Sequence, residues 1–571
     1  MRANWINFCV LALWGGLAVQ SAHAADQPSL KQGLVGHWPL VSDAKDVSGQ
    51  GRDARNRGVT WTAGTAGSKG ESGASFDGLQ SFLEVPPDAK SELGQKDFSV
   101  ATWVWTDGST DDVPGDILSQ YDPATRRGFQ MTLKTNTGVT FNQANFRQLQ
   151  FGIDSERASD WRDCGKPGKQ SLLAFGLVAH RGQLFAGTCE PGEGDSGRVS
   201  RYSHGTTWID CGSPSPSNSI TAMASFEGEL YVGTGKYRVA GSALSESPNT
   251  NLGGHIYRYA GGTDWVDCGA LTLSDQPTRI EAVSGMVTFQ GRQYAGSLYK
   301  PAGFFLRSDA GGWNDIAVPD GKRVEALAVY NGHLYATSYD SSHVYRFDGK
   351  TWSDMGQLGE PSQNSQTYAF AVYEGRLYAG TWISGRVYRF EEANKWTDVG
   401  RLGEELEVMG MMVHNGRMVA GTLPLAEVYQ FNGGSEWQKI TQLDTTPDVK
   451  YRRAWTMAEY QGQLFCSTLP NGRVHACEIG KLTTWDEEFP TGWHHVTAIK
   501  SGGKLELFVD GALKSSSSEF DPANYNLTND RPLKIGMGQN DFFRGRLRDV
   551  RLYDRALSTS EAKTLATMDK P

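Results

Sequence analysis

The sequence predicts an all-β protein in which a seven-bladed β-propeller interrupts a β-sandwich. Three observations support this: a composition rich in glycine and aromatic residues, a hairpin unit repeated seven times, and two flanking segments that complement each other. Of 571 residues, 68 are Gly, 17 Trp, 21 Tyr and 24 Phe. Glycine permits tight turns and aromatic residues favour strands. The formal net charge of -9 disfavours nucleic acid or an anionic membrane as partner, because both require a basic face.

The first 24 residues are typical of a signal peptide. Arg2 is followed by an apolar run over 8–19 and an Ala-x-Ala site at 22–24. The apolar run is shorter than the ~20 residues that span a bilayer, so we expect a secreted or periplasmic protein without membrane insertion. Because such compartments are oxidising, we expect disulfides among the remaining cysteines. These are Cys164, Cys189, Cys211, Cys268, Cys466 and Cys477.

Residues 155–484 contain the repeat. Each copy has two strands joined by a turn that ends in glycine, as in Gly375-Arg-Leu-Tyr-Ala-Gly-Thr381, and a third strand follows. The other copies begin at Gly182, Gly228, Gly291, Gly332, Gly416 and Gly462. A Trp-x-Asp-x-Gly unit, or a degenerate form of it, supplies the fourth strand. Its tryptophans are Trp161, Trp208, Trp265, Trp313, Trp352, Trp396 and Trp437. Four strands in each such repeat are typical of propeller blades.

The order of these two units predicts how the ring closes. The first Trp strand precedes the first hairpin, and the last hairpin has no Trp strand after it. We therefore expect residues 158–165 to supply the outer strand of the last blade. The alternative is an open array, which would leave strand edges unpaired.

The flanks, 25–154 and 485–571, alternate between apolar and polar residues with period two, which predicts half-buried strands. They contain the motifs Ser75-Phe-Asp-Gly78, Leu149-Gln-Phe-Gly-Ile-Asp154 and Gly492-Trp-His-His-Val496. In this order the motifs resemble the LamG / concanavalin A-like jelly roll. The resemblance implies one jelly roll built from both flanks, with the propeller inserted at a loop. After its last strand, Ser558-Thr-Ser-Glu561 predicts a capping box and a short C-terminal helix.

The same resemblance implies a structural Ca²⁺ site at Asp46, Asp77 and Asp549. The alternative is that these aspartates form turns by accepting hydrogen bonds from their own backbone. Asp549 is the most informative of the three, because Asp is unfavourable inside a strand. We expect no organic cofactor.

Residues that carry function are expected on the propeller face where the second and fourth strands end. Candidates for binding a substrate are Lys236, Tyr237, Arg238, Tyr299, Lys300, Tyr339, Trp382 and Trp455. Candidates for catalysis are Glu325, Tyr368, His343, Arg323 and Arg452. The long loop 235–254 is expected to form a rim or lid. Aromatic rings and charged groups suit a sugar surface, although Arg and Glu here could instead form ion pairs between blades.

We interpret the protein as one that recognises a polysaccharide or glycoconjugate through the jelly roll, the propeller or both. One alternative is a carbohydrate-active enzyme. It would be a lyase with a Tyr or His base beside Arg or Lys, or a glycoside hydrolase with paired carboxylates. Another is an extracellular scaffold for protein contacts. The sequence has no common nucleophile or metal-binding motif, which favours binding, whereas the ionisable ring favours an enzyme. Both folds host many functions.

Overall fold

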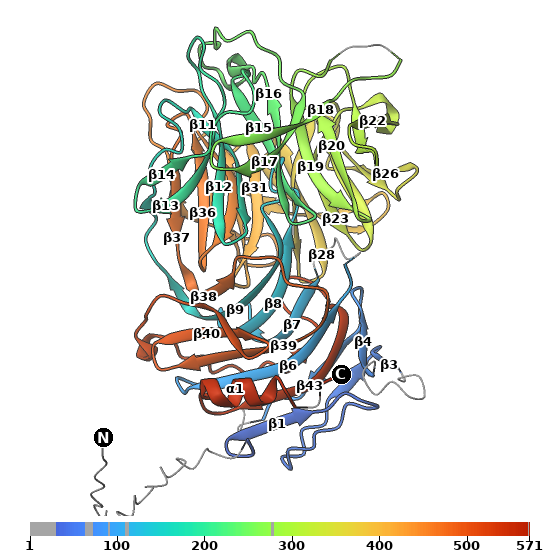
Figure 1. Ribbon diagram of the computed structural model, residues 1–571, viewed down its shortest axis with the longest axis vertical. Coiled ribbons are helices and arrows are strands. Elements are labelled where there is room, and N and C mark those ends of the chain that lie inside the picture. The colour runs from blue at the N-terminus through green and yellow to red at the C-terminus, as the bar shows by residue number, and fades with distance from the viewer. Residues whose placement is uncertain (1–29, 63–71, 89–91, 109–113, 276–278, 569) are drawn as a thin grey trace, which may run out of the picture.

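A computed structural model describes residues 30–62, 72–88, 92–108, 114–275, 279–568 and 570–571. The predicted signal peptide, residues 1–24, lies outside these ranges. Within them, no helix combines the length and apolar character needed to cross a membrane. The molecule has two bodies, a propeller and a sandwich (Figure 1). Strands β8 (Arg127–Asn136) and β9 (Asn145–Ala158) lie where the two bodies meet.

The sandwich consists of two antiparallel sheets, and each sheet takes strands from both flanks. The first sheet contains β1 (Leu34–Trp38), β3 (Thr60–Thr62), β4 (Gly73–Asp77), β6 (Phe98–Thr106), β39 (Gly492–Ser501), β40 (Lys504–Val509), β41 (Ala512–Ser516) and β43 (Arg544–Tyr553). The second contains β2 (Arg55–Arg57), β5 (Phe82–Val85), β42 (Leu533–Ile535), β7 (Gly115–Asp122), β8, β9 and β38 (Ile479–Trp485). Between them Phe98 packs against Phe129 and Phe151, with ring centroids 5.1 and 5.8 Å apart. The flanks therefore form one jelly roll, as predicted.

The boundary of the insert differs from the sequence prediction by one strand. β38 was expected in the propeller, but it pairs with β9 in the sandwich, with Ile479 opposite Ala158 and Trp485 opposite Leu149. β38 is buried on both faces, so its sequence resembles a blade strand. The insert thus spans 159–478, and its two ends are neighbours across a strand pair.

The described residues form seven four-stranded blades. Blade one contains β11 (Leu173–His180), β12 (Gln183–Cys189), β13 (Val199–His204) and β14 (Thr207–Asp210). Blade two contains β15 (Ser219–Phe226), β16 (Glu229–Gly235), β17 (His255–Gly261) and β18 (Asp264–Ala270). Blade three contains β19 (Val283–Phe289), β20 (Arg292–Ser297), β21 (Phe304–Arg307) and β22 (Trp313–Ile316). Blade four contains β23 (Val324–Tyr330), β24 (His333–Ser338), β25 (His343–Phe347) and β26 (Trp352–Gln357). Blade five contains β27 (Gln366–Tyr373), β28 (Arg376–Trp382), β29 (Arg386–Glu392) and β30 (Lys395–Arg401). Blade six contains β31 (Glu407–His414), β32 (Arg417–Leu423), β33 (Glu427–Phe431) and β34 (Trp437–Gln442). Blade seven contains β35 (Arg453–Tyr460), β36 (Gln463–Leu469), β37 (Val474–Cys477) and β10 (Arg162–Asp163).

The ring closes through β10, which comes from the beginning of the insert. Arg162 lies opposite Ala476, and Asp163 lies opposite His475 in β37. The backbone N–H of Cys164 also donates to the carbonyl of Val474, 2.8 Å away. Blade seven is thus built from both ends of the insert, and its outer edge is paired, as the order of the repeats predicts.

The Trp-x-Asp-x-Gly unit has a local role and a role between blades. In blade one the Asp210 carboxylate accepts a hydrogen bond from the N–H of Gly212, 2.9 Å away, and Gly212 has a φ of +88°. The indole of Trp208 donates to the carbonyl of Cys164 at 2.8 Å. Equivalent tryptophans in blades two, four, five and six bond in the same way to the preceding blade. The motif therefore ends the outer strand and ties neighbouring blades together.

The sandwich supplies the centre of the propeller. The turn between β8 and β9, residues 137–144, enters the ring, and we call it the plug. The plug carbonyl of Gly138 accepts a hydrogen bond from the N–H of Phe370 in blade five, 3.0 Å away, and that of Phe141 accepts from Met286 in blade three, 3.2 Å away. Further hydrogen bonds reach blades one, two, four and seven. This role of residues 137–144 was not predicted from the sequence.

Helix α1 (Thr559–Leu565) follows the last sandwich strand. The Ser558 hydroxyl accepts a hydrogen bond from the backbone N–H of Glu561, and the Glu561 carboxylate accepts one from the backbone N–H of Ser558. This reciprocal pair is the capping box that the sequence predicts.

Candidate functional site

A buried polar network closes the sandwich face that points toward the propeller. Glu459 of β35 accepts hydrogen bonds from His414 at 2.8 Å and Gln150 at 2.9 Å, and lies 3.0 Å from the Lys134 ammonium. Burial alone would raise the pKa of Glu459, but Lys134 and His414 hold it down to about 2. Nearby, two nitrogens of Arg417 each lie 2.7 Å from the Asp154 carboxylate. This sheet face therefore offers no access to a polymer.

The opposite face of the propeller contains most of the predicted site residues. Its floor is an aromatic layer in which Phe141, from the plug, packs against Phe175, Tyr368 and Trp455 with centroid distances of 5.6 to 6.2 Å. The indole of Trp455 donates to the carbonyl of Phe175 at 3.0 Å. Trp455 is thus part of the floor, and only 1% of it is exposed.

Two carboxylic acids stand on this floor, Glu325 at the start of β23 and Glu407 at the start of β31. Glu325 is completely buried, and neither of its carboxylate oxygens has a hydrogen-bond partner among the described residues. Burial raises the pKa of Glu325 well above its ordinary value; Arg323 opposes this rise, and Glu407 adds to it. Burial also raises the pKa of Glu407 to about 7, against the influence of Arg453. Both groups therefore retain protons at pH values where ordinary carboxyls are ionised.

The arginines beside these acids already have partners. Arg323 makes a paired contact with Asp340, at 2.9 Å, donates to the carbonyl of Leu298 at 3.0 Å, and lies 4.3 Å from the centroid of the Tyr339 ring. Arg453 donates to the hydroxyl of Ser242. Arg323, a candidate to stand beside a Tyr or His base, is therefore already neutralised by Asp340.

Two other predicted catalytic residues have partners of their own and no recorded contact with the acids among the described residues. The His343 ring is 2.7 Å from the Asp354 carboxylate, on the outer strand of blade four. The Arg452 guanidinium donates to the carbonyl of Thr446 at 2.8 Å. The structure therefore groups Glu325, Tyr368 and Arg323 but not His343 and Arg452.

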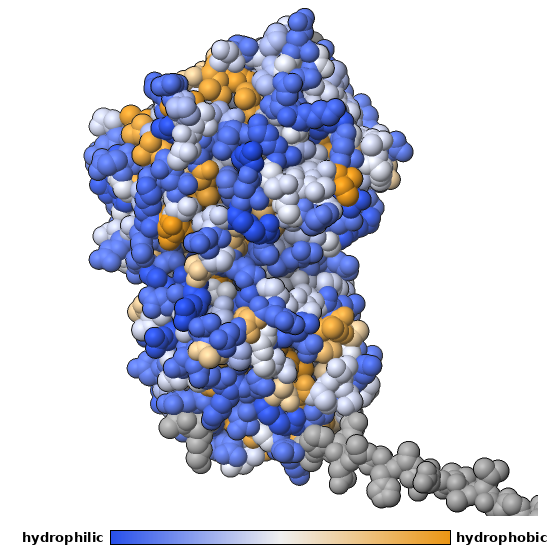
Figure 2. Space-filling view, turned by 90° about the vertical axis from the view of Figure 1, so that its left-hand side faces the viewer, coloured by the Kyte–Doolittle hydropathy of each residue, from blue (hydrophilic) through white to orange (hydrophobic). Residues whose placement is uncertain are grey.

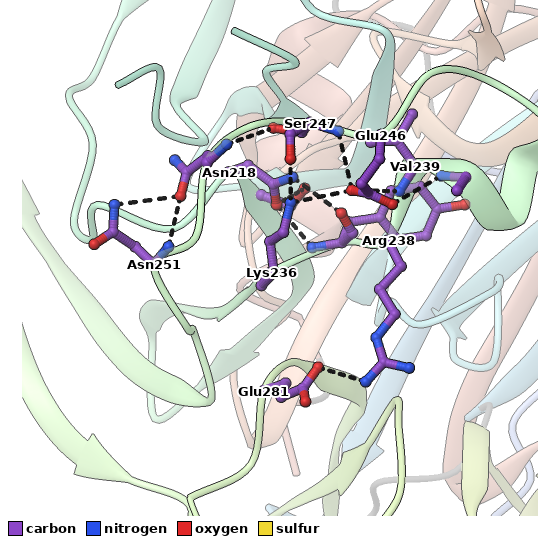
Figure 3. Close-up of polar contacts among 12 residues, drawn as sticks. Asn218, Lys236, Arg238, Val239, Glu246, Ser247, Asn251 and Glu281 are labelled. Carbon is purple, nitrogen blue, oxygen red and sulfur yellow. Dashed lines mark hydrogen bonds and ion pairs between the residues drawn. The ribbon is translucent and has the colours of Figure 1, made fainter. Parts of the chain in front are cut away.

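The loop after β16 reaches blade seven through Ser242, in agreement with the expected rim. Figure 3 shows polar contacts that hold this loop. Lys236 donates to Glu246 at 3.1 Å, and the same carboxylate accepts from the N–H of Ala240 at 3.0 Å. Ser242, in the short 3₁₀ turn η2 (Val239–Ser242), contacts the Tyr237 hydroxyl at 2.6 Å and is the residue that meets Arg453 from blade seven. Lys236 and Tyr237 thus fix the loop across the ring.

The rim of this face is aromatic. Tyr299, Tyr339 and Trp382 are half-buried, and Trp382 packs edge-on against Tyr451 with centroids 6.1 Å apart. Arg238 lies 4.5 Å from the Tyr299 ring centroid and 2.8 Å from Glu281, and the Lys300 side chain is 75% exposed. Tyr451 was not predicted, although it directly precedes the basic pair at 452–453.

The aspartates of the expected calcium site have other partners. Asp46 accepts from the backbone N–H groups of His37 at 2.9 Å and Arg52 at 3.0 Å. Asp77 accepts from the N–H of Leu79 at 2.8 Å, and Asp549 lies 2.6 Å from the His37 ring. No group of three or more His, Cys, Asp or Glu suited to a metal occurs in the described ranges. These contacts fit turn-forming and ion-paired aspartates, and the calcium site stays a prediction.

The expectation of disulfides is wrong for the six cysteines after the signal peptide, which are all free thiols. Cys164, Cys211 and Cys268 occupy the same motif position in successive outer strands, so the repeat itself keeps them one blade apart. Cys466 and Cys477 pack in the core of blade seven. Buried thiols of this kind act as small apolar side chains.

Comparisons with known proteins match part of the chain to one family and find distant likenesses among solved structures. Residues 460–563 match the Concanavalin A-like lectin/glucanases superfamily, which confirms the resemblance seen in the sandwich motifs. No curated protein matches the chain. Similar solved structures include a streptogramin B lyase (9% identity, 56% of this chain and 98% of that one, TM-score 0.44). They also include virginiamycin B lyase from Staphylococcus aureus (9% identity, 56% of this chain and 99% of that one, TM-score 0.43). A third is the extracellular domain of a B. thetaiotaomicron protein described as a hybrid two component system (11% identity, 62% of this chain and 46% of that one, TM-score 0.40). With TM-scores below 0.5, these likenesses support no conclusion about this chain.

Proposed function

We propose that this is an extracellular protein that recognises a carbohydrate on the propeller face away from the sandwich. The observation that carries the proposal is Glu325, whose buried carboxyl group has no partner among the described residues beneath a partly exposed aromatic rim. Leaving a buried polar group unsatisfied costs about 1–3 kcal/mol. Because Glu325 is 0% exposed, a ligand hydroxyl must displace the side chains that cover this carboxyl group before it can bond to it, and it would then recover that free energy. The lectin/glucanase match of the sandwich supports a carbohydrate as the class of ligand.

The two bodies restrict where such a ligand can bind. The Glu459 network covers the sandwich sheet, and the plug fills the propeller centre from the same side. The opposite face remains, with half-buried Tyr299, Tyr339 and Trp382. Aromatic faces of this kind stack on the apolar faces of sugar rings.

Binding is favoured over a lyase reaction because two of the arginines on this face are engaged in ion pairs. Proton abstraction beside a uronate needs a base and a cation that can face the substrate. Arg323 is paired with Asp340, and Arg238 is paired with Glu281.

A glycoside hydrolase is the second candidate, and one observation favours it. Glu325 and Glu407 both have raised pKa values, and the charge of Glu407 contributes to the rise at Glu325. A protonated carboxyl beside a second carboxylate is what a general acid requires.

The test is a retention assay on neutral and acidic polysaccharides, with wild type, Trp382→Ala and a control, Trp105→Ala, which changes a half-buried tryptophan of the sandwich. We expect retention of at least one polysaccharide, reduced about ten-fold or more by Trp382→Ala and unchanged by Trp105→Ala. Release of shorter products by wild type but not by Glu325→Gln would support the hydrolase instead. Equal retention of both variants would refute a site on this face.

A further inference from the structure

We propose a second binding site, a groove along the junction of propeller and sandwich that holds an extended neutral polysaccharide chain. Two hollows of about 350 and 390 Å³ form it, one beside blades one and two and one beside blade seven and the sandwich. A smaller hollow of about 30 Å³ lies between them. Figure 2 shows this side of the molecule, where the surface between the two bodies is mostly hydrophilic.

Shared lining residues show that the three hollows are neighbours, and we infer that together they form one groove. His180 and Arg181 line both the hollow beside blade two and the middle one. Asp486 and Glu487 line both the middle hollow and the one beside the sandwich. The groove therefore runs past the β11–β12 turn, from one body to the other.

The chemistry of the walls suits a chain of hydroxyl groups. At the sandwich end the lining presents amides and hydroxyls, which both donate and accept hydrogen bonds. These belong to Gln461, Gln463, Ser515, Ser516 and Ser518. At the propeller end, the half-buried ring of Tyr259 packs edge-to-face against the buried Phe185, with ring centroids 5.5 Å apart, and offers apolar surface to a sugar ring.

The charges in the groove favour a neutral chain over a polyanion. Arg181 and Arg258 both face Glu229, at 3.1 and 3.6 Å. Lys514 lies 4.9 Å from the ring centroid of Trp485 and lines the same hollow as the acidic Glu487. Because acidic groups accompany the basic ones along the groove, it offers no excess of positive charge to an acidic polymer.

The size of the groove favours several sugar units over one. Each of the two large hollows reaches the range of about 300–1,000 Å³ that is common for small-ligand sites. A chain that fills both must cross the narrow middle part, so affinity should rise with chain length until both hollows are occupied.

The test measures binding of cello-, xylo- and manno-oligosaccharides of two to eight units by titration calorimetry. Ser516→Trp fills the sandwich end, and Tyr259→Ala removes apolar surface at the propeller end. Leu513→Trp is the matched control, because Leu513 is 51% exposed on the same strand as Ser516 and does not line the groove. Thermal melting checks that each variant is folded.

We expect one oligosaccharide series to bind with affinity that rises with length, and Ser516→Trp and Tyr259→Ala to lower the affinity for six or more units at least ten-fold. Leu513→Trp and Trp382→Ala should leave it unchanged, which separates this groove from the propeller face. Absence of binding to all three neutral series, or affinity that is independent of length or unaffected by both groove variants, would overturn the proposal.

Discussion

Glu459 is the residue on which the contact between the two bodies depends. It is fully buried and interacts with Lys134 of the sandwich and His414 of the neighbouring blade. We expect Glu459→Ala to lower the free energy of unfolding by about 3–5 kcal/mol, because it leaves a buried ammonium without its counter-charge. Denaturant unfolding measures this, with the exposed Glu360→Ala as control. Similar stabilities for the two variants would contradict this role.

A second residue-scale prediction concerns Asp486. Burial raises the pKa of Asp486 to about 7, while hydrogen bonds from Thr484 and Gln461 limit the rise. The folded protein therefore keeps a proton that the unfolded chain, with a pKa near 3.8, has lost. The resulting stability is complete below about pH 4 and is lost as the pH rises through about 7.

We expect Asp486→Asn to remove this dependence, so that its Tm gains on that of wild type between pH 5 and 8. The carboxylate of Glu459, with its pKa of about 2, loses its contribution only at acidic pH and does not interfere in this window. Melting curves across pH measure the difference, with the exposed Asp530→Asn as control. A constant difference in Tm across the window would refute the assignment.

At the scale of elements, the plug is the feature that most needs a test. Phe141 is 1% exposed and lies within the propeller although it belongs to a sandwich turn. We expect Phe141→Ala to lower the free energy of unfolding by about 3–5 kcal/mol, since a cavity would form where several blades meet. Leu513→Ala, at an exposed apolar position, should change it little. Calorimetric unfolding compares the two variants.

The hairpins and outer strands could be predicted because each repeat carries its own instructions. Asp210 and Gly212 fix their turn within three residues, and the same spacing recurs in other blades. The plug could not be predicted in this way. Val139 and Phe141 are apolar residues in a turn, and their partners lie up to several hundred residues further along the chain.

At the scale of the whole molecule, the insert should be separable from the sandwich. Ala158 and Ile479 lie opposite each other, so a two-residue Asn-Gly turn can replace 159–478. We expect this variant to fold as a sandwich, because its propeller-facing residues are largely polar. We expect its stability to be lower than that of the whole protein, because it loses its contacts with the blades. We expect the isolated segment 159–478 to lack a stable fold, because it has no plug. Circular dichroism and limited proteolysis distinguish these outcomes, and a stable isolated segment would contradict the central role of the plug.

The placement of the candidate residues was predicted in part for the same reason as the fold. Position on the propeller face follows from the repeat, and it brings Glu325, Tyr368 and Tyr339 together. The pairing of His343 with Asp354 depends on one side chain of the outer strand, and no periodic pattern signals it. The groove between the bodies could not be predicted, because it exists only once the sandwich and the blades are in contact.

The plug also has a consequence for the order in which the protein is made. Residues 137–144 leave the ribosome before any blade does, whereas β39, β40 and β43 leave it after the last blade. The plug is therefore synthesised before the propeller that surrounds it, and the sandwich that carries the plug is completed only after the propeller. A nascent chain that ends within the blades contains the plug around which the blades pack, but it lacks the last strands of the sandwich.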